Sequence, residues 1–166
     1  IDLPGEAEGG IFSKEKLHQV ELATSSFGQG QTVTMIQLAS AFSAVINGGN
    51  YYQPHVVKEI NSESGAVVSS NDNTLVKRVV SEDASKLIRK YLEKTVEDDE
   101  GTASPARVKG YVIGGKTGTA EKWPRNEGKY LVSFAGFTPT DKPELMIYVV
   151  IDEPHVSDQA HSTYAT

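Results

Sequence analysis

The segment from Gly114 to Ala120 reads GGKTGTA, and it sets a cation, two hydroxyl groups and several small residues side by side. Successive side chains of an extended strand point to opposite faces, so Thr117 and Thr119 should share one face and Lys116 the other. Two such hydroxyls can donate to both oxygens of one carboxylate, and the ammonium supplies the opposite charge. Because the neighbours are small, an extended peptide can pair with the strand edge. The segment therefore predicts a carboxylate-binding strand edge.

The same stretch also satisfies the pattern of a phosphate-binding loop. Residues 110–117 read GYVIGGKT and match G-x-x-x-x-G-K-[ST] at every position. Such a loop needs a buried strand before its first glycine and a helix that begins at the lysine, so that backbone N–H groups converge on the phosphates. Residues 111–113 are strong strand formers instead, and Gly118 and Pro124 follow the lysine. This context favours the carboxylate site over a nucleotide site.

Composition narrows the class of protein. The chain has 166 residues, 38% of them hydrophobic, and 15 glycines, which indicates one domain rich in loops. A net charge of −6 without a basic run argues against nucleic acid as a partner. No apolar run approaches the roughly 18 residues that span a bilayer. The absence of cysteine excludes disulfides and thiolate metal sites.

We expect neither a cofactor nor a metal. His155 and His161 share a polar tail with Asp152, Glu153 and Asp158, but no pair of them has the spacing of ligands on a helix or a strand. The tail is therefore interpreted as a solvated segment. The acidic run at residues 97–100 is likewise typical of a solvated loop.

Residues 1–50 are predicted to form a helical part. Ser13 is expected to cap a helix over residues 13–23. Thr32 or Thr34 is expected to cap a stronger helix, whose apolar face runs over residues 35–46 before a pair of glycines ends it. Between them, Ser26–Gly30 is either a tight turn or a second candidate site, and its two glycines favour the turn.

Residues 51–80 are predicted to form a surface arm, with a strand over residues 54–60, a short strand over residues 66–68 and a polar loop over residues 69–73. Residues 81–100 contain the most regular helix of the chain. Ser81 is its expected cap, and apolar residues repeat every three and four positions after it.

Residues 110–152 have the pattern of strands rather than helices and predict a three-stranded meander. The strands are expected at residues 111–120, 130–137 and 144–151, joined by short loops that contain proline. Short connections favour antiparallel neighbours, with the lysine strand on one side and two helices on a face of the sheet. The expected fold class is α/β of the α+β type, an antiparallel sheet with helices packed on it.

Three separated segments now resemble one family. Residues 1–6 (IDLPGE), 22–30 (LATSSFGQG) and 115–120 (GKTGTA) are similar, in this order, to segments of class B penicillin-binding proteins, the transpeptidases that cross-link peptidoglycan. The resemblance covers nearly the whole chain and implies an incomplete β-lactamase/transpeptidase-like fold. Shorter matches support it at Val33-Thr34, Gln37-Leu38, residues 47–49, residues 54–58 and residues 152–154.

The family signature contains S-x-x-K, a second serine motif and K-T-G. Ser13–Lys16 and Ser69–Asn71 match the first two by letter, and we expect neither to be catalytic. A nucleophilic serine begins a buried helix, where its lysine loses solvation and works as a base, whereas charged residues surround Ser13. In the family both serine motifs precede the segment that resembles residues 22–30. The resemblance therefore implies that residues 1–166 are the C-terminal portion of a transpeptidase domain and that the nucleophile precedes Ile1.

The resemblance also implies roles for the lysine strand. Lys116 would belong to the proton-handling network of the serines, and the N–H of Thr119 would be one oxyanion donor. Thr117, Gly118 and Thr119 would bind the carboxylate of the acyl donor or of a β-lactam. One oxyanion donor contributes about 3 kcal/mol, so these residues alone should not catalyse turnover.

The implied function is that of a penicillin-binding peptidoglycan D,D-transpeptidase, which acts by serine acyl transfer and is anchored at the extracytoplasmic face of the bacterial cytoplasmic membrane. Stem peptides and β-lactams would bind through the whole domain, with the N-terminal half of that domain as partner. A non-catalytic binding module and a serine β-lactamase or D,D-carboxypeptidase are the alternatives. A role in division, elongation or sporulation stays open. Self-association of residues 1–166 is expected from exposed apolar surface.

Overall fold

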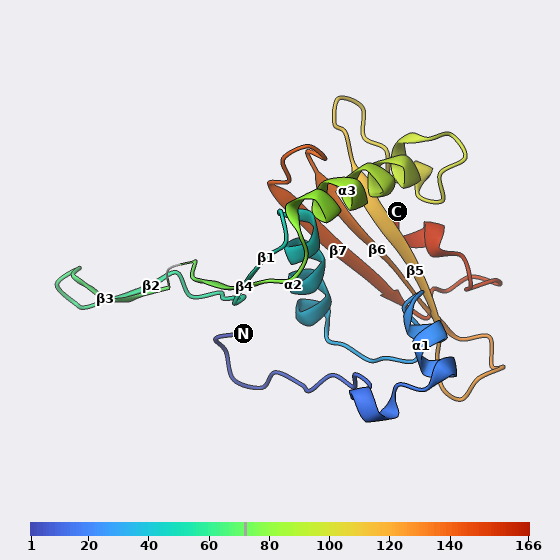
Figure 1. Cartoon of the computed structure of the whole chain (residues 1–166), viewed down its shortest axis with the longest axis horizontal. Helices are drawn as coiled ribbons and strands as arrows, with labels where there is room; N and C mark the ends of the chain where they lie inside the picture. The colour runs from blue at the N-terminus through green and yellow to red at the C-terminus, as the bar shows by residue number, and fades with distance from the viewer. Residues whose placement is uncertain (72) are drawn as a thin grey trace.

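A computed structural model describes residues 1–71 and 73–166, and an antiparallel sheet of three strands lies at its centre. The strands are β5 (Gly114–Glu121), β6 (Tyr130–Thr138) and β7 (Leu145–Asp152), in the order β5-β6-β7. Figure 1 shows them side by side. The predicted meander is confirmed, and β5 is an edge strand. It begins three residues later than expected, because the N–H of Ile113 donates to Glu97 Oε1 at 2.9 Å instead of joining a ladder.

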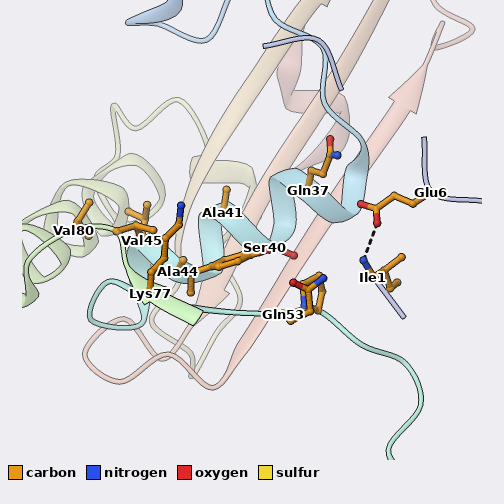
Figure 2. Close-up of a pocket in the computed structure, with 13 residues that line it drawn as sticks. Ile1, Glu6, Gln37, Ser40, Ala41, Ala44, Val45, Gln53, Lys77 and Val80 are labelled. Atoms are coloured by element: carbon orange, nitrogen blue, oxygen red, sulfur yellow. Dashed lines mark hydrogen bonds and ion pairs between the residues drawn. The ribbon is translucent and has the colours of Figure 1, made fainter. Parts of the chain in front are cut away.

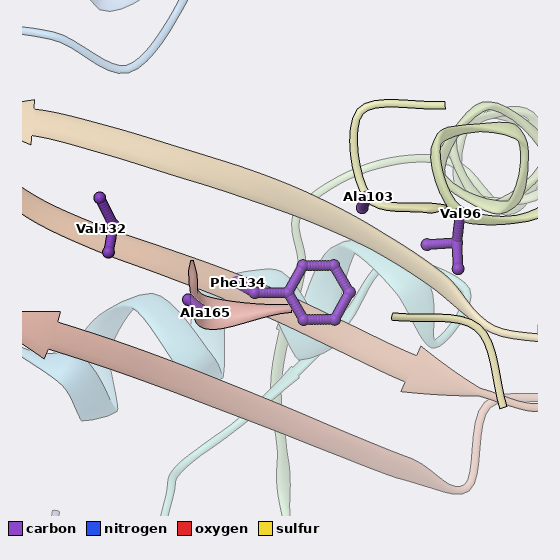
Figure 3. Packing of buried hydrophobic residues seen from close by; sticks show 5 residues of the cluster. All are labelled: Val96, Ala103, Val132, Phe134 and Ala165. Carbon is purple, nitrogen blue, oxygen red and sulfur yellow. The ribbon is translucent and has the colours of Figure 1, made fainter. Parts of the chain in front are cut away.

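The core follows β6, the central strand. Residues 132–137 are buried on both faces of the sheet, and Val132 is fully inaccessible to solvent. A cluster around this strand joins Val96, Ala103, Val132, Phe134 and Ala165 (Figure 3). Ala165 lies in η3 (Ser162–Ala165), and η2 (Ser104–Ala106) follows Ala103. A strand buried on both faces explains why the sequence of β6 shows no alternation.

Two helices pack against the sheet as predicted. In α2 (Met35–Ile46), the Oγ1 of Thr34 accepts from the N–H of Gln37 at 3.2 Å, and Gln37 Oε1 accepts from the N–H of Thr34 at 3.0 Å. This reciprocal capping confirms Thr34 as the cap. Phe42 of α2 meets Phe137 of β6 edge to face at 6.0 Å.

The helix predicted after Ser81 is α3 (Glu82–Glu97). The Oγ of Ser81 accepts from the N–H of Ala84 at 3.1 Å, which confirms the cap. The backbone of Glu93 approaches Gly114, so α3 lies along β5. The helix ends at Glu97, three residues before the predicted end, and residues 98–100 leave the helix in the direction of η2.

The single helix predicted over residues 13–23 is wrong. The structure has a 3₁₀ turn, η1 (Lys14–Lys16), and a separate short helix, α1 (Gln19–Ser25). The backbone of Leu17 is not helical, and the side chain of Ser13 caps neither element. Neither element buries a residue, so no apolar face holds the two pieces together as one helix.

The predicted arm is present but is paired differently. β1 (Asn50–Tyr52) pairs with β4 (Leu75–Arg78), and β2 (Glu59–Asn61) pairs with β3 (Val67–Ser70), both antiparallel. Figure 1 shows the arm reaching away from the sheet.

The expected strand over residues 54–60 is wrong for most of its length. Pro54 has no N–H to donate, and the carboxylate of Asp2 accepts from the N–H groups of Val56 and Val57, each at 2.9 Å. The expected polar loop over residues 69–73 is strand at Ser69 and Ser70, and its residue Asp72 lies outside the described residues. Strand β4 was not predicted. Of the helices in the described ranges, none has both the length and the apolar content needed to cross a bilayer.

Candidate active-site edge on strand β5

Every second residue of β5 points its backbone carbonyl and N–H to the outer edge of the strand, away from β6. On this edge the carbonyl of Thr117 accepts from Lys116 Nζ at 2.6 Å, and the carbonyl of Thr119 accepts from Gln29 Nε2 at 3.3 Å. The carbonyl of Gly115 accepts from Thr95 Oγ1 of α3. In an antiparallel pair, the N–H and C=O of one residue point to the same side. The N–H groups of Thr117 and Thr119 therefore point to this outer edge as well.

Helix α3 covers only the beginning of this edge. Glu97 binds the N–H of Ile113, and Thr95 binds the carbonyl of Gly115. Beyond Gly115, the contacts across the edge are those made by Lys116 and Gln29, within the residues that the structure describes. The stretch from Thr117 to Thr119 is therefore the accessible part of the edge.

The side chains of β5 alternate as predicted. Lys116 stands opposite Ala135 and is exposed, whereas Thr117 and Thr119 stand opposite Phe134 and Val132 on the other face and are half-buried. At the edge, the hydroxyls, the ammonium and the N–H of Thr119 lie within four consecutive residues. This set can neutralise a carboxylate and donate to the oxygen of an attacked carbonyl.

The glycines of β5 serve packing more than ligand access. A Cβ on Gly115 would lie 2.4 Å from the ring of Phe134, and one on Gly114 would lie 2.5 Å from Phe137. Both glycines are buried. A Cβ on Gly118 would meet the hydroxyl of Ser133 at 2.6 Å. Side chains of β6 therefore require these glycines on the faces of the sheet, whereas the ligand was expected at the outer edge of β5.

The segment Ser26–Gly30 is a turn that also reaches the candidate site. Gly28 and Gly30 both have φ of +84°, a conformation that favours glycine, so the predicted turn is confirmed. Between them, the side chain of Gln29 contacts Thr119, 90 positions along the chain. Gln29 was predicted only as part of the candidate segment Ser26–Gly30, and its contact with Thr119 was not predicted, because no spacing rule connects two residues so far apart.

Neither serine motif found by letter has the surroundings of a nucleophile. Ser13 precedes a 3₁₀ turn with no buried residue, and its hydroxyl lowers the pKa of the Glu15 carboxyl by hydrogen bonding to it. Ser69 lies in β3, whose four residues are all exposed, on the outer half of the arm (Figure 1). Lys16 is exposed too, so its charge stays solvated.

The phosphate-loop interpretation does not fit the backbone. Lys116 lies inside a strand that continues to Glu121, so no helix begins at the lysine. The N–H groups of a strand point alternately to its two edges and do not converge on one anion.

The acidic residues at the end of β7 and in the segment after it are paired with basic side chains. Lys122 Nζ lies 2.8 Å from Asp152 Oδ1 and 2.7 Å from Glu153 Oε1. Hydrogen bonds to Asp152 and then to Glu153 raise the pKa of Lys122. His161 Nε2 lies 3.0 Å from Asp158 Oδ2. The pairs of Lys122 link the residue after β5 to the end of β7, whereas the His161–Asp158 pair is local to the C-terminal segment.

A separate groove of about 550 Å³ lies between α2 and the base of the arm (Figure 2). Its lining includes Gln37, Ser40, Ala44 and Lys77, with the Ile1 ammonium 2.7 Å from Glu6 Oε2 at one end. The lining is mainly apolar, and no residue of β5 contributes to it. The groove is therefore separate from the candidate edge of β5.

Comparison with known proteins gives one consistent result. Residues 1–166 match the family model described as the penicillin-binding protein transpeptidase domain. Among curated proteins, the chain is 46% identical to stage V sporulation protein D of Bacillus subtilis over 99% of this chain and 26% of that protein. It is 32% identical to the probable peptidoglycan D,D-transpeptidase PenA of Neisseria meningitidis over 97% of this chain and 26% of that protein.

Solved structures agree with this result. The transpeptidase domain of Burkholderia pseudomallei penicillin-binding protein 3 matches with a TM-score of 0.82 and 29% identity, over 99% of this chain and 48% of that one. Penicillin-binding protein 3 of Mycobacterium tuberculosis, complexed with ampicillin, matches with a TM-score of 0.84 and 28% identity. The match covers 92% of this chain and 36% of that one. The chain thus spans about a quarter of the length of the curated relatives described.

Proposed function

This chain belongs to the family of penicillin-binding protein transpeptidase domains, and on that basis we propose that it supplies one wall of the active site of a peptidoglycan D,D-transpeptidase. The observation that carries the proposal is the accessible edge of β5, where Lys116, Thr117 and Thr119 present a cation, two hydroxyls and outward N–H groups. The antiparallel sheet and its helices are those of the family fold.

The reaction would be an acyl transfer in two steps. A serine oxygen attacks the carbonyl carbon of the penultimate D-Ala, and the terminal D-Ala leaves with a proton on its amine. An amine of a neighbouring stem peptide then takes the acyl group and releases the serine. Thr117 and Thr119 would hold the terminal carboxylate, and the N–H of Thr119 would donate to the developing oxyanion. Lys116 would neutralise the carboxylate and take part in proton transfer.

We assign the nucleophile to a serine outside residues 1–166. Ser13 and Ser69 both lie in exposed local structure without a buried lysine beside them. The edge of β5 beyond Gly115 is open where an opposite wall would face it. That wall would be the N-terminal half of the same domain and would carry both serine motifs.

β-Lactams are proposed as inhibitors of the same site. A β-lactam offers a carboxylate and a strained carbonyl at a spacing similar to that of the D-Ala-D-Ala terminus. The mycobacterial structure bound to ampicillin supports this proposal by its similarity. Because the substrate is peptidoglycan, we place the complete protein at the extracytoplasmic face of the cytoplasmic membrane, anchored by residues outside this chain.

Covalent labelling of the complete protein with a fluorescent penicillin tests this function. We expect one labelled serine outside residues 1–166. Thr119→Val should lower the acylation rate about 10- to 100-fold, because one hydrogen bond to a charged group contributes roughly 1.5 to 3 kcal/mol. Lys116→Ala should lower it at least as much.

Exposed positions of the same residue type provide matched controls. Thr102→Val and Lys142→Ala should leave the acylation rate unchanged, because both side chains are exposed and neither residue belongs to β5. A stable penicillin adduct on Ser13 would overturn the assignment of the nucleophile. Full labelling of Lys116→Ala at the wild-type rate would overturn the proposed role of β5.

A further inference from the structure

We propose that Gln29 is a positioning residue that holds the accessible edge of β5 in its working geometry. Its Nε2 donates to the carbonyl of Thr119 at 3.3 Å, and this contact is part-buried. The proposal rests on the proposed function, since Thr119 is the residue to which that function assigns both a hydroxyl and an N–H donor.

Gln29 lies in a turn whose backbone is held by hydrogen bonds. Its own N–H donates to the carbonyl of Thr24 at 3.0 Å, and the N–H of Gly28 donates to the carbonyl of Ser25 at 3.1 Å. Gln31 Nε2 closes the loop by binding Ser25 Oγ at 2.9 Å. The turn is therefore tied to the end of α1, which lies beside β5 in Figure 1. Because the turn is held in this way, the side chain of Gln29 can fix the position of the Thr119 carbonyl relative to the turn.

The edge of β5 needs a second anchor at this point. Helix α3 holds the edge through Thr95 and the carbonyl of Gly115, four residues before Thr119. Between these anchors, among the residues that the structure describes, the outer side of β5 is bound by Lys116, whose Nζ donates to the carbonyl of the neighbouring Thr117. The ladder to β6 holds the inner side of β5 as far as Glu121, and Gln29 adds a restraint on the outer side at Thr119. Misplacing a donor by about 1 Å can cost roughly 100-fold in rate.

The chemistry of the amide makes the contact testable. The carbonyl of Thr119 only accepts, so Gln29 must present a donor. A glutamate at this position has the same length but is an acceptor when ionised, and it regains a donor only when protonated. A glutamate variant should therefore regain activity as the pH falls, whereas a purely structural defect has no reason to follow that titration.

The test compares Gln29→Ala and Gln29→Glu with the control Gln53→Ala, all in the complete protein. Gln53 is an exposed glutamine of the arm and lies outside both β5 and the loop that carries Gln29. We expect Gln29→Ala to lower the second-order rate of acylation by a fluorescent penicillin about 10- to 100-fold, with melting temperatures like that of the control. Gln29→Glu should be equally slow at pH 7.5 and recover toward pH 4 to 5, where about half of ordinary glutamates are protonated. Gln53→Ala should follow the wild-type pH profile.

Two results would overturn the proposal: acylation of Gln29→Ala within about twofold of wild type, or a Gln29→Glu variant without recovery at low pH. A second readout is independent of activity. The ¹³C′ resonance of Thr119 should move upfield in Gln29→Ala and stay in place in Gln53→Ala. If the wild-type protein takes no penicillin, the proposed function fails, and the Thr119 resonance alone then decides whether Gln29 holds the edge.

Discussion

At the scale of single residues, β5 combines two demands on its side chains. Gly114 and Gly115 must be small because Phe137 and Phe134 of the neighbouring strand occupy the space above them. Lys116 and the two threonines must be polar because they present the accessible edge. The alternation of side chains along a strand predicts the polar positions from sequence. The need for small residues depends on which residues of β6 stand opposite, and that is decided by the pairing of the strands in the tertiary structure.

Gly115→Ala should destabilise the protein by about 1 to 3 kcal/mol, because the new methyl group would overlap the ring of Phe134 and press on the carbonyl of Ala135. Urea unfolding measures the effect. Ala120→Ser, an exposed change on the same strand, serves as the control and should stay within about 0.5 kcal/mol of wild type. Equal stability of the two variants would contradict the packing argument.

At the scale of elements, the bend of the arm, which lies between β1 and β2, depends on Asp2, a residue near the N-terminus. The carboxylate of Asp2 accepts from Val56 and Val57, and Asn71 Nδ2 lies 3.4 Å from Asp2 Oδ2 and 2.6 Å from the carbonyl of Val57. These contacts occupy the N–H groups between β1 and β2 and divide the arm into two short ladders. Strand propensity alone could not show this, because the competing acceptor comes from residue 2.

This contact predicts a pH dependence of the bend. The N–H of Val56, followed by that of Val57, lowers the pKa of Asp2 below its usual range. A lowered pKa means that the ionised carboxylate is favoured in the fold. Its contribution is complete above the unfolded pKa, about 3.9, and is lost as the pH falls through the lower folded pKa.

We therefore expect the amide resonances of Val56 and Val57 to be constant from pH 8 to pH 5 and to shift together only below about pH 4. Asp2→Asn should remove this titration and leave the amides of β7 unaffected. Amides that titrate near pH 6, or that keep their titration in Asp2→Asn, would show that another group holds the bend.

At the scale of the whole molecule, the two faces of the sheet are covered unequally. Helix α2 packs on one face through Phe42 and Phe137. On the other face, Leu145 and Ile147 of β7 are 54% and 53% exposed, beside a groove of about 420 Å³. Strand β7 is also an edge strand. An apolar face next to an open edge favours association of chains.

Residues 1–166 on their own should therefore self-associate, and Ile147→Lys should shift them toward the monomer because it places a charge on the apolar face. Light scattering after size-exclusion chromatography measures the mass. Val76→Lys is the matched control, since Val76 is equally exposed but lies on the arm. A wild-type monomer, or a shift caused by Val76→Lys alone, would contradict the assignment of the interface to β7.

Local signals account for what the sequence determined by itself. Thr34 and Ser81 cap their helices through neighbours three residues away, the three strands of the meander follow their turns, and the alternation of Lys116 with Thr117 and Thr119 follows from the period of a strand. Each depends on forces that act within a few residues. The prediction of one helix over residues 13–23 was wrong because this segment has no apolar face that the fold buries.

Only the tertiary structure decided which groups meet. It brought Gln29 to Thr119, Thr95 to Gly115 and Asp2 to the arm, each through a hydrogen bond between distant segments. It also left the edge of β5 open from Thr117 to Thr119. Such contacts depend on how whole elements pack, so no local propensity encodes them, and they decide which part of β5 is accessible.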